Sequence, residues 1–169
     1  WLARSGRRYP DRPALFSGET QLTDYQGFAR SAAAIGAGLR AQYGIAPGDR
    51  VAIFAKNTPA YLEAMFGAWF AGAAIVPINA KLHPKEAAYI IENSGASLVF
   101  ATAPLGGELA GALAQPGPRL IDLEGAEFEA LRQSTPLAAP VERAGSDMAW
   151  LFYTSGTTGR PKGVMISHG

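Results

Sequence analysis

The 169-residue sequence contains no cysteine and only two histidines, His83 and His168, which lie far apart. Disulfide bonds and thiolate metal sites are therefore excluded, and the two histidines do not have the spacing of metal ligands. The net charge is only +1, and no cluster of Lys and Arg exceeds three residues. The sequence lacks the basic stripe that is typical of nucleic-acid-binding proteins, so we expect no nucleic-acid partner.

Charged residues are also scarce, at 17%, against 48% hydrophobic residues, which excludes a disordered chain. Residues 64–80 carry no charge, but the stretch is short for a membrane span and is interrupted by Gly72 and Pro77. A buried helix followed by a buried strand explains it better, and we expect no stable membrane insertion. No apolar core of a signal peptide follows the charged N-terminal residues, and we expect a cytoplasmic protein.

Strand and helix patterns alternate along most of the chain. Short apolar runs predict strands at 51–54, 74–76, 97–100, 120–122 and 148–153. Helices are predicted between them at 59–72, 84–94, 104–114 and 127–133. A short hairpin around 14–22 and a helix from Thr23 to Gly44 precede them, with Gln26 completing a capping box. This alternation predicts an α/β fold with a doubly wound, mostly parallel sheet and flanking helices.

A loop rich in glycine separates the run at 148–153 from a second predicted strand at 164–166. It holds Gly156, Gly159 and Gly163 with several Ser and Thr residues and one lysine. Glycine lets backbone N–H groups approach an anion, hydroxyls donate hydrogen bonds, and lysine adds positive charge, so the loop predicts phosphate binding. It is not a Walker loop, because Arg-Pro-Lys follows Gly159 and a strand pattern follows Lys162. The alternative is a mobile hairpin tip that needs glycine only for its turn.

Residues 153–164, YTSGTTGRPKGV, resemble the phosphate-loop signature of the adenylate-forming superfamily. That superfamily comprises acyl-CoA synthetases, adenylation domains of peptide synthetases, and luciferases. Upstream segments are similar to its N-terminal region as well, so the resemblance spans most of the chain: GDRVAI at 48–53, AGAAIVPIN at 71–79 and YIIENSGA at 89–96.

The resemblance implies a two-step reaction. A carboxylate attacks the α-phosphate of MgATP to give an acyl-adenylate and pyrophosphate, and a thiol, usually coenzyme A, then displaces AMP. The loop would hold the β- and γ-phosphates, with Lys162 offsetting their charge, while Arg160 occupies a variable position of the signature. Hydroxyl donors and close backbone approach would come from Thr154, Ser155, Gly156, Thr157, Thr158 and Gly159.

The resemblance also implies that residues 1–169 form the N-terminal part of an AMP-binding domain that ends just after this loop. The C-terminal domain, the catalytic residues, the magnesium ligand and most of the acyl pocket are expected downstream, so we expect the 169 residues alone to be inactive. The favoured function is that of an ATP-dependent carboxylate–CoA ligase, with a role in fatty acid metabolism. Its small-molecule partners would be a carboxylic acid, ATP with Mg²⁺, and CoA. Alternatives are an amino-acid-activating domain that loads a carrier protein and a non-catalytic nucleotide-binding module.

Several single residues have both a functional and a structural interpretation. His168 stands either beside the active-site cleft or at a strand end. His83, before Pro84, is interpreted as a helix-start residue. Trp69, with its aromatic neighbours, has the helical spacing of core packing rather than of a ligand site. Arg4, Arg7 and Arg8 are expected on a solvated N-terminal helix face.

Overall fold

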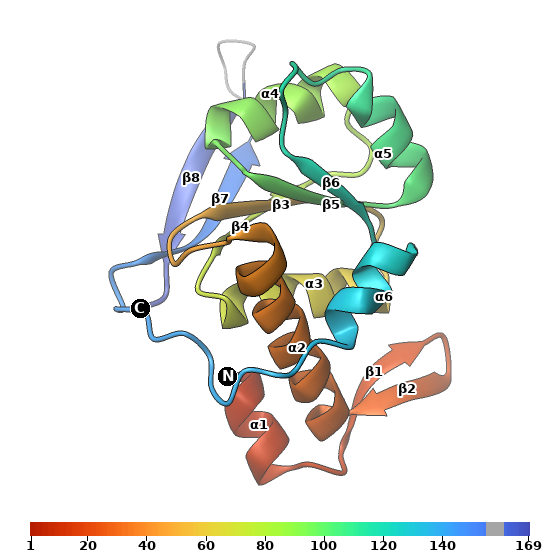
Figure 1. Cartoon of the computed structure of the whole chain (residues 1–169), viewed down its shortest axis with the longest axis vertical. Coiled ribbons are helices and arrows are strands. Elements are labelled where there is room, and N and C mark those ends of the chain that lie inside the picture. The colour runs from red at the N-terminus through yellow and green to blue at the C-terminus, as the bar shows by residue number, and fades with distance from the viewer. Residues whose placement is uncertain (155–160) are drawn as a thin grey trace.

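The computed structural model describes residues 1–154 and 161–169. Its main sheet has six strands in the order β6-β5-β3-β4-β7-β8, and β1 and β2 form a separate antiparallel hairpin (Figure 1). Within the main sheet all neighbouring pairs are parallel except β7–β8. The strands span β1 Pro13–Ser17, β2 Thr20–Asp24, β3 Arg50–Phe54, β4 Ala74–Ile78, β5 Leu98–Ala101, β6 Arg119–Asp122, β7 Met148–Thr154 and β8 Lys162–Ser167. The predicted α/β class with a mostly parallel sheet is therefore confirmed.

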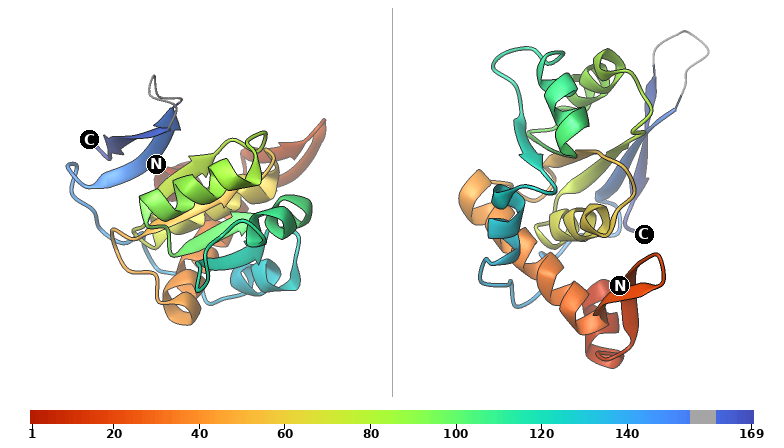
Figure 2. Two further views of the ribbon diagram at one scale, coloured as in Figure 1. Left: turned by 90° about the horizontal axis from the view of Figure 1, so that it is seen from above. Right: turned by 90° about the vertical axis from the view of Figure 1, so that its right-hand side faces the viewer.

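Helices cover both faces of this sheet (Figures 1 and 2). One layer is formed by α2, α3 and α6, and the other by α4 and α5. The N-terminal helix α1 packs beside α2, with Arg4, Arg7 and Arg8 exposed as expected. The helices span α1 Leu2–Arg8, α2 Tyr25–Tyr43, α3 Pro59–Phe70, α4 Pro84–Ser94, α5 Ala103–Ala110 and α6 Ala126–Arg132.

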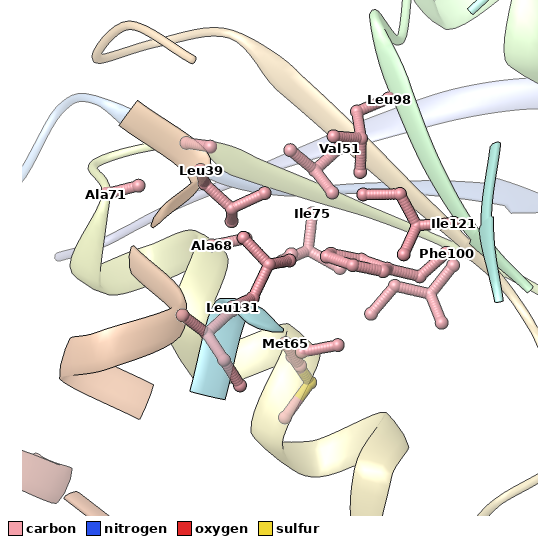
Figure 3. Packing of buried hydrophobic residues seen from close by; sticks show 14 of the residues in the cluster. Leu39, Val51, Met65, Ala68, Ala71, Ile75, Leu98, Phe100, Ile121 and Leu131 are labelled. Carbon is pink, nitrogen blue, oxygen red and sulfur yellow. The ribbon is translucent and has the colours of Figure 1, made fainter. Parts of the chain in front are cut away.

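The central strand β3 is buried on both faces, and its alternate side chains enter different helix layers. Val51 and Ile53 pack with α2, α3 and α6, whereas Ala52 and Phe54 pack with α4 and α5. Figure 3 shows the first cluster, in which Val51, Ile75 and Phe100 point from three neighbouring strands toward the helices. A continuous apolar run is what a strand with two buried faces requires, which is why these runs were recognisable.

Local signals placed most helix ends correctly. Thr58 caps α3 through its side chain with Pro59 in the first turn, and His83 caps α4 in a capping box with Glu86, confirming its helix-start role. Gly44 ends α2 in the left-handed conformation. The predicted start of that helix at Thr23 was wrong, because Thr23 still belongs to β2 and the Asp24 carboxylate accepts the hydrogen bond from the Gly27 N–H.

The uncharged stretch 64–80 forms the end of α3 and then β4, as predicted. Its side chains are mostly buried, those of α3 and Ile75 in the cluster with α2, and Val76 and Ile78 in the cluster with α4 and α5. In the part of the chain that the structure describes, no helix combines the length and the apolar character needed to cross a membrane.

Helices α2 and α3 cross at two glycines that allow an unusually close approach. A Cβ atom on Gly67 would lie 2.7 Å from Ile35 Cβ, and one on Gly36 would lie 2.8 Å from Phe70 Cβ. Both distances are shorter than van der Waals contact, so the crossing excludes any larger residue at either position.

We predict that Gly67→Ala lowers the free energy of unfolding by about 1–3 kcal/mol, because the added methyl group must displace the Ile35 side chain or separate the helices. The matched control is Gly107→Ala in α5, where an added Cβ meets nothing within 4 Å. That change is expected to be neutral or to stabilise by up to about 1 kcal/mol through helix propensity. Equal effects of the two changes in denaturant unfolding would contradict the packing argument.

The last residue of α2 is tied to α6 and β6 by a polar cluster. The Tyr43 hydroxyl donates to Glu127 Oε1 at 2.6 Å, and Arg119 pairs with the same carboxylate. Burial, followed by the hydrogen bond to Glu127, raises the pKa of Tyr43 from 10.0 to about 12. Burial acts to raise the pKa of Glu127, but the hydrogen bonds from Tyr43 and Arg119 outweigh it and lower that pKa.

We predict a pH dependence of stability from Tyr43. Because folding favours the neutral phenol, its stabilising contribution is fully present below pH 10.0 and is lost as pH rises through about 12. The difference in unfolding free energy between wild type and Tyr43→Phe should therefore be constant up to the lower value and shrink above it. A difference that stays constant through the alkaline range would show that Tyr43 titrates normally in the fold.

Candidate functional site

The predicted phosphate loop joins β7 to β8 as the tip of an antiparallel hairpin. Thr154 and Lys162 form the last cross-strand pair before the tip, and both are exposed. The strand after Lys162 is confirmed, which separates this loop from the strand–loop–helix arrangement of a Walker site. Five of the predicted phosphate ligands lie outside the described residues, as does Arg160: Ser155, Gly156, Thr157, Thr158 and Gly159.

β7 follows the parallel sheet only at its beginning. β7 pairs with β4 at a single position, Ile75 with Trp150. Two residues later β4 contains Pro77, which has no N–H group to donate a hydrogen bond to a neighbouring strand. The distal half of the hairpin rises instead beside α4 (Figure 1). The loop therefore follows the carboxyl end of a strand, as expected, but that strand has by then left the parallel ladder.

The base of the loop is attached to the last turn of α4. The Tyr153 hydroxyl donates a hydrogen bond of 2.7 Å to Asn93 Oδ1. Burial, and then the proximity of Tyr89, raises the pKa of Tyr153, which keeps the phenol protonated and able to donate. Sequence reasoning missed this contact, since no pattern links residues that lie 60 positions apart.

Glycine is needed at position 163 for packing, which sequence reasoning did not identify. A Cβ atom there would lie 3.0 Å from Leu151 Cδ1 and 3.2 Å from Tyr153 Cζ. Because Tyr153 and Gly163 are direct cross-strand partners, the tyrosine ring occupies the space above the glycine. Gly163 thus accommodates Tyr153, while the glycines of the tip itself lie outside the described residues.

The opposite face of the hairpin exposes apolar side chains. On this face Phe152, Val164 and Ile166 are between 37% and 47% exposed, whereas Met165, which pairs with Leu151 on the other face, is 75% exposed. Large exposed apolar patches mark surfaces that contact other proteins, membranes or ligands.

His168 lies at the end of the hairpin that is far from the loop. It follows β8, roughly 20 Å along the strand from Lys162 at the usual rise per residue. Its backbone N–H donates to Asp147 O at 3.0 Å. This geometry favours the interpretation of His168 as a strand-end residue.

A cavity of about 440 Å³ adjoins the same end of the hairpin, between α1, α3 and the segment before β7. Trp69 and Trp150 line it with His168. Trp69 is nevertheless a packing residue, since its ring meets Phe66 and Trp150 edge-on and its indole N–H donates to Ala149 O at 3.0 Å. Among the described residues, no group of three or more His, Cys, Asp or Glu side chains could hold a metal ion.

The chain is similar to known proteins along its whole length. Residues 2–169 match the family model described as "AMP-binding enzyme". The feruloyl-CoA synthase of Amycolatopsis sp. is 41% identical over 169 residues, which cover 100% of this chain and 33% of that protein. Tyrocidine synthase 3 of Brevibacillus parabrevis is 36% identical over 162 residues, covering 94% of this chain and 2% of that protein.

The fold is also found in solved structures. A Mycobacterium tuberculosis fatty acyl CoA synthetase superposes with a TM-score of 0.84 and 31% identity, over 99% of this chain and 34% of that one. The chain therefore spans about a third of the length of the acyl-CoA-forming relatives that it matches.

Proposed function

Because the chain belongs to the family of AMP-binding enzymes, we propose that it is the N-terminal part of an ATP-dependent carboxylate–CoA ligase. The whole protein would convert a carboxylic acid and ATP to an acyl-adenylate and pyrophosphate, and then transfer the acyl group to CoA. The observation that carries this proposal is the hairpin, which presents Thr154 and Lys162 at the base of a loop rich in glycine and hydroxyl groups.

We further propose that this loop binds the pyrophosphate portion of ATP. Thr154, Ser155, Thr157 and Thr158 would donate hydrogen bonds from their hydroxyls, and Gly156 and Gly159 would let backbone N–H groups approach the phosphates. Lys162, exposed at the start of β8, would offset negative charge as pyrophosphate leaves. A carboxylate becomes a good acylating agent only when one of its oxygens departs as a phosphate ester, so stabilising the leaving group favours the first step.

The names of two relatives suggest two different acyl acceptors, CoA and a carrier protein. Feruloyl-CoA synthase supports CoA, whereas the similarity to tyrocidine synthase 3 keeps a carrier-protein acceptor as the second candidate. CoA is favoured because the identity is higher and the match includes the whole chain. A non-catalytic nucleotide-binding module is the third candidate, but the loop retains its complete signature.

Residues 1–169 would then form the N-terminal part of the AMP-binding domain, with the catalytic groups supplied downstream. ATP is used with Mg²⁺ in this chemistry, but the described residues offer no set of metal ligands, and we assign no Mg²⁺ ligand within them. We propose a cytoplasmic location because that compartment supplies both ATP and CoA.

The proposal is tested by ATP–pyrophosphate exchange with the full-length protein and a panel of aliphatic, aromatic and amino acids. We expect exchange that depends on a carboxylic acid, followed by formation of the CoA thioester. Exchange with an amino acid, and acyl transfer only to a carrier protein, would favour the second candidate. Absence of acid-dependent exchange across the panel would favour the non-catalytic module.

We predict that Lys162→Ala lowers the rate of this exchange by about 10- to 100-fold, since a charge-assisted contact to the leaving phosphates is lost. Arg7→Ala is the matched control, because Arg7 is an exposed cation on α1, which lies far from the end of the hairpin that carries Lys162 (Figure 1). It should leave the rate unchanged. An unaltered rate in Lys162→Ala would remove the role proposed for this lysine.

We also predict that residues 1–169 expressed alone catalyse no adenylation, because the chain spans about a third of its CoA-ligase relatives. The measurement is acid-dependent pyrophosphate release by the isolated fragment, with the full-length protein as positive control. Release by the fragment above the level without acid would show that a complete catalytic site lies within these residues.

A further inference from the structure

We propose that Tyr153 is a positioning residue that, with Asn93 and Gly163, fixes the direction in which the phosphate loop leaves the fold. The kinetic consequences of this inference rest on the proposed function. The hydrogen bond between Tyr153 and Asn93 does not depend on that function. The loop grips its ligand only if both of its ends are held in place, because a misplaced binding group loses much of its effect.

The β7–β8 hairpin contacts the rest of the described sheet only through β7. In the described sheet, β8 is an edge strand whose neighbour is β7, and all six of its residues are exposed. β7 is paired with β4 at one register position only, below the distal half of the hairpin. Side chains of β7 therefore help to set the direction of that half, and one of them bonds to α4.

Only alternate residues of β7 can make such contacts. Leu151 and Tyr153 pack against the cluster that includes Ile90 and Ile91 of α4, whereas Phe152 points away and is exposed. Tyr153 is the last inward-facing residue before Thr154 closes the hairpin. Among the described residues of β7, it is thus the last whose side chain packs against the rest of the fold.

Tyr153 constrains both strands of the hairpin at once. Its ring lies over Gly163 of β8, and its hydroxyl donates to Asn93 on the last turn of α4. A chain of contacts therefore runs from α4 through the phenol to the two strands that begin and end the loop. The ring provides packing, and the hydroxyl fixes where the ring sits along α4.

The kinetic test uses the full-length enzyme and three variants. Tyr153→Phe keeps the ring and removes the hydroxyl, and Asn93→Ala removes its acceptor. Tyr43→Phe is the matched control, because it also removes a tyrosine hydroxyl bonded to a side-chain oxygen, but one that lies on α6. We expect the KM for ATP in the exchange assay to rise about three- to tenfold in the first two variants, the range that one lost hydrogen bond supports.

The KM for the carboxylic acid is expected to stay unchanged in these variants, because the Tyr153–Asn93 hydrogen bond, which we call the tether, joins α4 to the base of the loop. The double variant Tyr153→Phe/Asn93→Ala should match either single variant, since both changes break the same contact. Additive effects, or a KM for ATP in Tyr153→Phe equal to that of Tyr43→Phe, would overturn the proposal.

A second readout does not depend on catalysis. We expect amide hydrogen exchange of residues 162–166 to accelerate about three- to tenfold in Tyr153→Phe and Asn93→Ala, and not in Tyr43→Phe. Asn93→Asp keeps an oxygen acceptor and should retain the protection of the wild type. Unchanged exchange in the first two variants would exclude the tether. If the wild-type enzyme shows no ATP–pyrophosphate exchange, the proposed function fails, while this measurement still decides the tether.

Discussion

Burial of β3 on both of its faces is the constraint on which the rest of the structure depends. Its odd-numbered and even-numbered side chains enter two separate cores, one under α2, α3 and α6 and the other under α4 and α5. Each of the two helix layers must therefore pack closely against its own face of the sheet. The close crossing of α2 and α3 at Gly36 and Gly67 is one consequence, because it lets both helices reach that face.

The hairpin that carries the proposed phosphate loop is less buried than the rest of the sheet. It projects from the edge of this closed core, and one face of it is apolar and exposed. Its orientation comes from the second core, through Leu151 and Tyr153, and from the hydrogen bond to Asn93. The contacts beside α4 thereby help to join the hairpin to the core of the fold.

The fold was predictable where local residue patterns decide the structure. Two-faced burial makes β3 a continuous apolar run, and the Thr58–Pro59 and His83–Pro84 pairs mark helix starts through backbone chemistry. The cap of α2 was placed one residue early, at Thr23 instead of Asp24, because both can cap a helix and Thr23 is taken up by strand β2. At the site, the loop was recognisable from composition, whereas the Tyr153–Asn93 contact depends on how β7 crosses α4, which no local pattern encodes.

The central claim is that the whole protein cleaves ATP between its α- and β-phosphates to activate a carboxylic acid for transfer to CoA. The most direct measurement is product analysis by mass spectrometry after incubation of the full-length protein with ATP, CoA and an acid. The account predicts AMP, pyrophosphate and the acyl-CoA thioester in equal amounts. Formation of ADP and phosphate, or nucleotide cleavage that does not depend on the acid, would contradict it.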